Sequence, residues 1–136
     1  MKKYILLFDD EPDIRELLIE DLSDQGYRVS GTGDPDECKR ILEEDPPALM
    51  IMDLQVEEGD GFTMIHEVKK LAPHIPILLL TGVLFDKEVV HETILKTVAA
   101  YLDKTASLKE ILVVVKRLLG DPVHPSASLV NDSGGQ

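Results

Sequence analysis

The chain has 136 residues, 43 % of them hydrophobic and 29 % charged, which fits one domain that buries a core of its own. Its formal net charge of −12 argues against direct nucleic-acid binding, because such binding rests largely on cationic side chains that replace counterions. The single cysteine excludes an internal disulfide and a multi-cysteine metal site, which suits a reducing compartment.

The first predicted strand, residues 4–8, is wholly apolar and runs into three acids at positions 9–11. The acids cut this apolar stretch before it reaches the usual length of a signal peptide, and no other stretch is long enough to cross a bilayer. We therefore expect a cytoplasmic protein without membrane insertion. The helix that follows begins near Pro12 and ends at Gly26, and its apolar residues recur at helical spacing: Ile14, Leu17, Leu18 and Leu22.

A second strand and helix lead to the most informative stretch of the chain. Residues 27–32 read as a weaker edge strand, and Asp34 is placed to cap the helix that follows it. Residues 49–52 are a short apolar run that ends in Asp53, which indicates a strand buried on both faces, as in a parallel sheet. Asp53 taken alone is as readily a solvated loop acid.

The alternation continues with a third and a fourth helix. The third is outlined between Phe62 and Ala72, and it leads into an apolar strand over residues 77–80 that ends at Thr81. Asp86 is the predicted cap of the fourth helix. The apolar stripe expected on this helix is Val89, Val90, Ile94, Thr97 and Val98.

The last predicted unit closes the domain. A short fifth strand over residues 99–102 is followed by Asp103 and Lys104, and Ser107 with Glu110 forms a capping box at the start of the last helix. We assign residues 1–120 to one domain. Residues 121–136 are rich in Pro, Ser, Gly, Asn and Asp without periodicity, so we expect a disordered tail or the stub of a linker.

Five strand-helix units in strict alternation predict an α/β fold, a flavodoxin-like doubly wound sandwich with helices on both faces. Its five-stranded parallel sheet would have the order 2-1-3-4-5. In that order the first and third strands are neighbours, so Asp9, Asp10 and Asp53 would converge at the carboxyl edge of the sheet, where open α/β sheets bind ligands.

Three carboxylates at one place repel one another, by roughly 4 kcal/mol per close pair at an effective dielectric of about 20. A hard divalent cation with oxygen ligands offsets this repulsion best, so we expect Mg²⁺, with Mn²⁺ as its substitute. Lys104 would add a positive charge at the same edge, and Thr81 a hydroxyl. With no base and no nucleophilic serine or cysteine nearby, such a set suits phosphoryl transfer onto a carboxylate.

These features together resemble a known family, the receiver domains of two-component response regulators, over about residues 3–119. The matching residues are Phe8-Asp9-Asp10-Glu11-Pro12 for the acidic pair after the first strand, Asp53-Leu54 with Asp60-Gly61 for the phosphoacceptor loop, Thr81 for the hydroxyl, Tyr101 for the switch aromatic and Lys104 for the lysine.

The resemblance implies that Asp53 accepts a phosphoryl group from a phosphohistidine on a sensor histidine kinase or a histidine phosphotransfer protein. It also implies that Mg²⁺ is held by Asp9, Asp10, Asp53 and the backbone carbonyl of Gln55. Such a protein is a phosphoacceptor that assists its own phosphotransfer and autodephosphorylation rather than an enzyme.

The resemblance further implies a switch. Thr81 and Lys104 would contact the phosphoryl oxygens, and Tyr101 would turn inward. The face formed by the fourth helix, the fifth strand and the last helix would then change shape and engage a downstream protein target.

Three places depart from the family pattern. Val56-Glu57 stands where Met-Pro is usual, Gly82 where alanine is common, and Thr105 where a proline follows the lysine. The bond before that proline is usually cis, and a cis bond costs about 3 kcal/mol or more without proline. We therefore expect Lys104-Thr105 to be either a strained cis bond or a trans bond with a shifted loop.

Three alternative functions stay open. The departures at Glu57 and Thr105 motivate a pseudo-receiver, a protein-interaction module with the same fold that is not phosphorylated. A phosphatase with an aspartyl nucleophile commonly has a second acid two residues on, where this chain has Gln55. A flavin-binding protein would need a phosphate-cradling loop after the first strand, where this chain has acids.

Overall fold

The structure is a computed structural model that describes residues 2–54, 60–81, 96–103 and 105–122. In chain order the elements are β1 (Tyr4–Asp9), α1 (Pro12–Asp24), β2 (Arg28–Thr32), α2 (Pro35–Glu44), β3 (Leu49–Leu54), α3 (Asp60–Leu71), β4 (Ile77–Thr81), β5 (Ala100–Asp103) and α5 (Leu108–Leu119). The five strands form one parallel sheet of order β2-β1-β3-β4-β5. This confirms the predicted fold class and strand order.

Two predictions from the sequence concern segments that the structure describes only in part. Most of the predicted fourth helix lies outside the described residues, which include only its last part, where Lys96 and Thr97 are helical. The predicted tail is described only as far as residue 122. Within the described ranges, no helix is both long and apolar enough to cross a bilayer.

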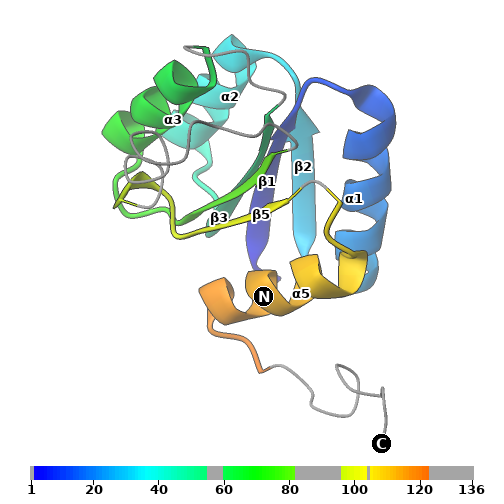
Figure 1. The fold of residues 1–136 in the computed structure, drawn as a ribbon. Helices are drawn as coiled ribbons and strands as arrows, with labels where there is room; N and C mark the ends of the chain where they lie inside the picture. The colour runs from blue at the N-terminus through cyan, green and yellow to red at the C-terminus, as the bar shows by residue number, and fades with distance from the viewer. Residues whose placement is uncertain (1, 55–59, 82–95, 104, 123–136) are drawn as a thin grey trace, which may run out of the picture.

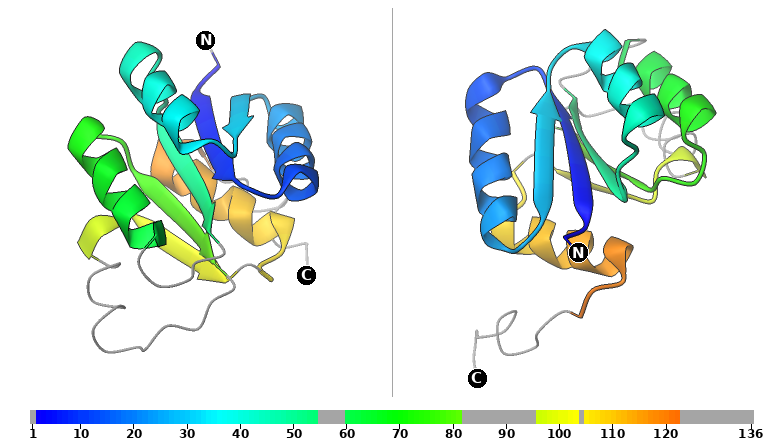
Figure 2. Two further views of the ribbon diagram at one scale, coloured as in Figure 1. Left: turned by 90° about the horizontal axis from the view of Figure 1, so that it is seen from above. Right: turned by 180° about the vertical axis from the view of Figure 1, so that it is seen from behind.

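Helices cover both faces of the sheet. Figures 1 and 2 show α1 and α5 on one face and α2 and α3 on the other. Because side chains alternate along a strand, β1 sends Leu7 toward α1 and α5 and Leu6 toward the opposite helices, and every residue of β1 is buried. The central strands are therefore enclosed, as their uninterrupted apolar runs predict.

The helix ends form where the sequence predicts them. The Asp34 carboxylate accepts a hydrogen bond from the backbone N–H of Asp36 at the start of α2. Ser107 and Glu110 form the complete capping box of α5, in which the Ser107 hydroxyl accepts from the Glu110 N–H at 3.1 Å. Gly120 ends this helix in the left-handed conformation, with φ of 73°.

One residue of the predicted stripe on α1 lies elsewhere. Leu18 and Leu22, one helical turn apart, are buried on the inner face, and Ile14 packs against the same cluster. Leu17 is 60 % exposed. It precedes Leu18 by one position, about 100° around the helix, so its side chain projects away from the sheet.

Candidate functional site

Two buried aspartates lie side by side at the carboxyl edge of the sheet. Asp9 of β1 pairs in register with Asp53 of β3, and their exposed fractions are 0 % and 2 %. By strand alternation both lie on the face that carries Leu7 and Ile51, which α1 and α5 cover. The predicted pairing of the first and third strands thus places two buried aspartates side by side.

The loop after β1 holds the Asp9 carboxylate in place. Asp9 Oδ1 accepts a hydrogen bond from the backbone N–H of Glu11 at 2.9 Å. Helix α1 begins directly afterwards, with Pro12 at its first position. Asp9 Oδ2 and Asp53 Oδ1 are both shielded from solvent. The carboxylate of Asp9 is therefore fixed before any ligand arrives.

The third predicted acid behaves differently from the other two. Asp10 follows Asp9 directly but is exposed, and the parts of the chain that the structure describes contain no group of three or more His, Cys, Asp or Glu side chains placed to hold a metal. Gln55, whose carbonyl was the fourth expected ligand, lies outside the described residues. The structure thus brings Asp9 and Asp53 together and leaves Asp10 beside them at the surface.

The chemistry of this donor set fits a hard divalent cation. Asp9 and Asp53 supply carboxylate oxygens, which Mg²⁺ prefers, and one or two carboxylates with retained water are its usual protein ligands. Two carboxylates buried in adjacent positions also repel each other, and a divalent cation bound there would offset this repulsion. Asp10 could add an oxygen by turning inward.

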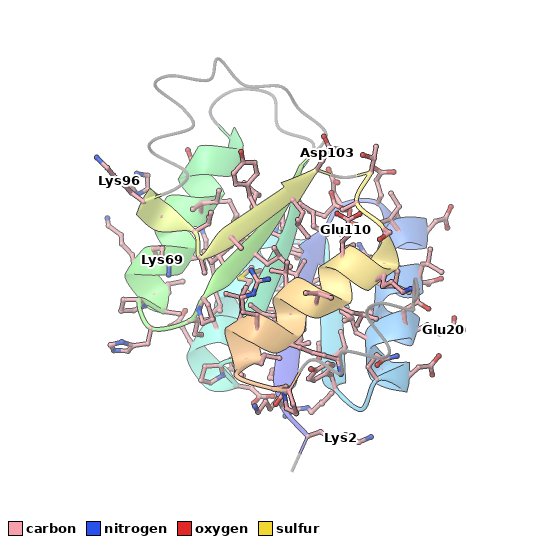
Figure 3. The ribbon with its side chains drawn as sticks, turned by 60° about the horizontal axis from the view of Figure 1, so that its bottom comes forward. Lys2, Glu20, Lys69, Lys96, Asp103 and Glu110 are labelled. Carbon is pink, nitrogen blue, oxygen red and sulfur yellow. The ribbon has the colours of Figure 1, made fainter. Side chains whose placement is uncertain are left out.

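The ends of β4 and β5 reach the same edge of the sheet. Thr81 pairs in register with Leu54, the residue after Asp53, and on its other side with Asp103. Figure 3 shows Asp103 at the tip of β5, at the end of the molecule opposite Lys2. Lys104 follows Asp103 in the chain but lies outside the described residues, as does its bond to the next residue.

Tyr101, the expected switch aromatic, lies two residues before the end of β5. Tyr101 pairs in register with Leu79 of β4, and 41 % of it is exposed. Because Leu79 belongs to the core on the α2 and α3 side, Tyr101 lies on that face of the sheet. Its ring is thus partly accessible on the sheet face opposite the two aspartates.

A pair of hydrogen bonds at the end of β5 was not predicted from the sequence. Asp103 Oδ1 accepts from the backbone N–H of Thr105 at 2.9 Å and from the Thr105 hydroxyl at 2.8 Å. These bonds, the backbone one foremost, lower the pKa of Asp103. A proline at position 105 could donate neither, so the departure from the family pattern has a structural use here.

Arg15 is the other contributor that the sequence analysis missed. Its Nη1 donates a 2.6 Å hydrogen bond to the backbone carbonyl of Asp9. The available signal was an arginine in the first turns of the helix that directly follows the acidic pair. Its spacing placed it near the acids, although spacing alone does not fix where so long a side chain ends.

Comparisons with known proteins identify relatives of this chain. The family model described as response regulator receiver domain matches residues 5–116. A putative NtrX-like response regulator of Rickettsia typhi is 29 % identical over 122 residues, which cover 83 % of this chain and 24 % of that protein. The chain thus spans about a quarter of the length of that curated relative.

Two solved structures are similar along most of the chain. The response regulator TrrA of Thermotoga maritima, solved in complex with Mg²⁺-BeF, is 29 % identical with a TM-score of 0.73, covering 88 % of this chain and 100 % of that one. The CheY-like receiver domain protein of Methanospirillum hungatei has a TM-score of 0.78 at 22 % identity, covering 88 % and 95 % of the two chains, and this likeness concerns the fold.

Proposed function

Since the chain belongs to the response regulator receiver domain family, we propose that it is a phosphorylation switch of a two-component system, with Asp53 as the phosphoacceptor. The observation that carries the proposal is the register pair of Asp9 and Asp53, both buried at the carboxyl edge of the sheet. A carboxylate fixed beside a second one, with a lysine following β5 at the same edge of the sheet, is an arrangement that suits phosphoryl transfer to an acid.

Each residue would have a distinct part in the transfer. A carboxylate oxygen of Asp53 attacks the phosphorus, the bond between phosphorus and the donor nitrogen breaks, and its electron pair returns to the donor imidazole. Thr81 and Lys104 would hold the phosphoryl oxygens. Mg²⁺, or Mn²⁺ in its place, would neutralise charge on those oxygens when held by Asp9, Asp10, Asp53 and the Gln55 carbonyl.

The proposed partners follow from the same chemistry. The donor would be a phosphohistidine on a sensor histidine kinase or on a histidine phosphotransfer protein, in the cytoplasm. The downstream target would be a protein that docks on the face formed by the fourth helix, β5 and α5, to which β5 would contribute the partly exposed Tyr101. The net charge of −12 favours protein partners over direct contact with nucleic acid.

The proposal is tested by the intact mass of the protein after incubation with acetyl phosphate and Mg²⁺. We expect a gain of one phosphoryl group that disappears in Asp53→Asn and in a chelator, and that survives in Asp36→Asn, an exposed acid on α2. If acetyl phosphate gives no adduct, a phosphohistidine protein is the second donor. No adduct from either donor contradicts the proposal.

One observation favours a second candidate, the pseudo-receiver. Thr105 replaces the family's proline beside Lys104 and donates two hydrogen bonds to Asp103, which would hold this loop in an arrangement of its own. A chain that binds Mg²⁺ yet gains no phosphoryl group from either donor would fit this candidate. Reverting Thr105→Pro would then be the first variant to test for a gain of phosphorylation.

A further inference from the structure

Arg15 reaches from helix α1 to the main chain that carries both acids of the acidic pair. Its Nη1 donates to the carbonyl oxygen of Asp9 at 2.6 Å, and its side chain is partly buried. That carbonyl belongs to the peptide unit joining Asp9 to Asp10. The hydrogen bond therefore ties the backbone from which the proposed metal ligands project to a rigid helix.

Two glycines of the neighbouring segment leave room for this side chain. A Cβ built on Gly31 would lie 2.7 Å from Ile19 Cδ1, 2.8 Å from Arg15 Cγ and 3.0 Å from Arg15 Cδ, so any larger residue there would press on both of these α1 side chains. A Cβ on Gly33 would lie 2.9 Å from Arg15 Nη1, 3.1 Å from the Asp9 carbonyl oxygen and 3.3 Å from Asp10 Cα. The Arg15 side chain thus packs against two glycines, which have no side chain, before it reaches the acidic loop.

Two further hydrogen bonds connect the backbone of Arg15 to the carboxylate of Asp9 through Glu11. The Arg15 backbone N–H donates to the Glu11 carbonyl at 3.0 Å, while the Glu11 N–H donates to Asp9 Oδ1 at 2.9 Å. The guanidinium of Arg15 thus binds this short loop at the Asp9 carbonyl, and the backbone N–H of Arg15 binds it at the Glu11 carbonyl. The orientation of the Asp9 carboxylate is consequently coupled to where the guanidinium sits.

We propose that Arg15 is a positioning residue of the divalent-cation site, holding the Asp9-Asp10 backbone in the geometry that binds Mg²⁺, with Gly31 and Gly33 as the space it requires. This inference rests on the proposed function. Residues that orient metal ligands without touching the metal commonly change metal affinity by tenfold to a hundredfold when removed.

The direction in which the Mg²⁺ affinity changes when Arg15 is replaced shows whether Arg15 acts through its hydrogen bond or through its charge. Removing a positive charge near a group of acids strengthens the binding of a cation if electrostatics alone acts. Loss of the hydrogen bond weakens binding, because the loop must then be ordered by the metal. A neutral side chain of similar length, Arg15→Met, therefore gives opposite results for the two explanations.

The first experiment measures Mg²⁺ affinity by calorimetry on the intact chain, below the unfolding transition of every variant. We expect Arg15→Met to raise the dissociation constant about tenfold or more. Arg40→Met, the same chemical change at an exposed position of α2, should leave the constant unchanged. At saturating Mg²⁺ the phosphorylation rate of Arg15→Met should approach that of the wild type, since only binding is impaired.

A second measurement needs no metal. Hydrogen exchange of the Glu11 amide, which donates to Asp9, should become faster in Arg15→Met and stay unchanged in Arg40→Met. Gly31→Ala, whose Cβ would press on the stem of Arg15 and on Ile19 but not on the acids, should also weaken Mg²⁺ binding.

The outcomes distinguish this inference from the function on which it rests. Mg²⁺ binding by the wild type that is lost in Asp53→Asn but equal or tighter in Arg15→Met overturns the role of Arg15 and leaves the proposed function standing. Absence of Mg²⁺ binding by the wild type overturns both.

Discussion

The Tyr27 hydroxyl donates a 2.8 Å hydrogen bond to Asp121 Oδ2, joining the residue before β2 to the second residue after α5. Lys3 Nζ donates to the other carboxylate oxygen of Asp121 at 2.5 Å and to the carbonyl of Leu119 at 2.7 Å. The chain after the last helix is thus fastened to the end of the sheet that lies opposite the two aspartates. The three side chains form a latch, Lys3-Tyr27-Asp121.

The latch makes stability depend on pH in the alkaline range. Burial, followed by the hydrogen bond and charge of Asp121, raises the pKa of Tyr27 above its ordinary value of 10.0. A raised folded pKa means that this contribution is complete below pH 10 and is lost as the pH rises through the folded pKa. We expect Tyr27→Phe to lower the free energy of unfolding by about 1 kcal/mol at neutral pH.

Urea unfolding at increasing pH measures this effect. The stability advantage of the wild type over Tyr27→Phe should shrink as the pH rises above 10. An advantage that stays constant up to strongly alkaline pH would show that the latch does not couple to tyrosine ionisation.

The Asp103-Thr105 hydrogen bonds predict a graded change in one pKa. Thr105→Val removes the hydroxyl and keeps the backbone N–H, while Thr105→Pro removes both donors. Because both bonds stabilise the charged carboxylate, the pKa of Asp103 should rise in the first variant and rise further in the second. A carboxyl titration by NMR measures this, and an unchanged pKa in Thr105→Pro would refute the described contacts.

The paired aspartates predict opposite effects of one substitution in the absence and presence of metal. Asp53→Asn removes the repulsion between two adjacent buried carboxylates, which is about 4 kcal/mol for a close pair at an effective dielectric of about 20, so the metal-free variant should be more stable. Saturating Mg²⁺ should stabilise the wild type, by about 2.7 kcal/mol at a hundredfold excess over the dissociation constant. It should stabilise the variant far less.

Thermal unfolding with and without Mg²⁺ measures both the stability of the metal-free variant relative to the wild type and the stabilisation of each protein by Mg²⁺. Glu20→Gln, which removes an exposed acid from α1, is the control for net charge and should keep the response to Mg²⁺. Equal stabilisation of the wild type and Asp53→Asn by Mg²⁺ would place the cation away from Asp53.

The single cysteine should be inert while the protein is folded. Cys38 is fully buried in the core between the sheet and α2, and burial raises its pKa from 9.0 to about 12. The thiolate fraction alone then falls roughly a thousandfold. Alkylation by iodoacetamide, followed by mass, should be slower by at least that factor in the native protein than in urea. Comparable rates would show that the α2 side of the core opens readily.

Most of the fold follows from patterns that are local in the sequence. Uninterrupted apolar runs such as residues 49–52 specify buried parallel strands, and the caps at Asp34 and Ser107 mark helix starts that the structure reproduces. The strand order follows from the handedness of the crossovers. Leu17 shows the limit of this reasoning, because a spacing of three or four residues leaves the edge of an apolar stripe undefined.

The candidate site likewise has one part that the sequence predicts and another part that it does not. The adjacency of Asp9 and Asp53 follows from strand order, since parallel strands end at one edge and register places equivalent residues side by side. The bond from Arg15 to the Asp9 carbonyl and the bonds from Thr105 to Asp103 depend on loop conformation and on long or rotatable side chains. Sequence spacing leaves these undetermined, so they required the structure.

The central claim is that Asp53, among the acids at this edge of the sheet, carries the phosphoryl group. The direct test is to treat the chain with acetyl phosphate and Mg²⁺, reduce the aspartyl phosphate with borohydride, and locate the resulting homoserine by peptide mass spectrometry. The account predicts homoserine at position 53 in place of Asp53 and none at Asp9, Asp10 or Asp60. Homoserine at one of those three positions, or at none of the four under either phosphodonor, would contradict it.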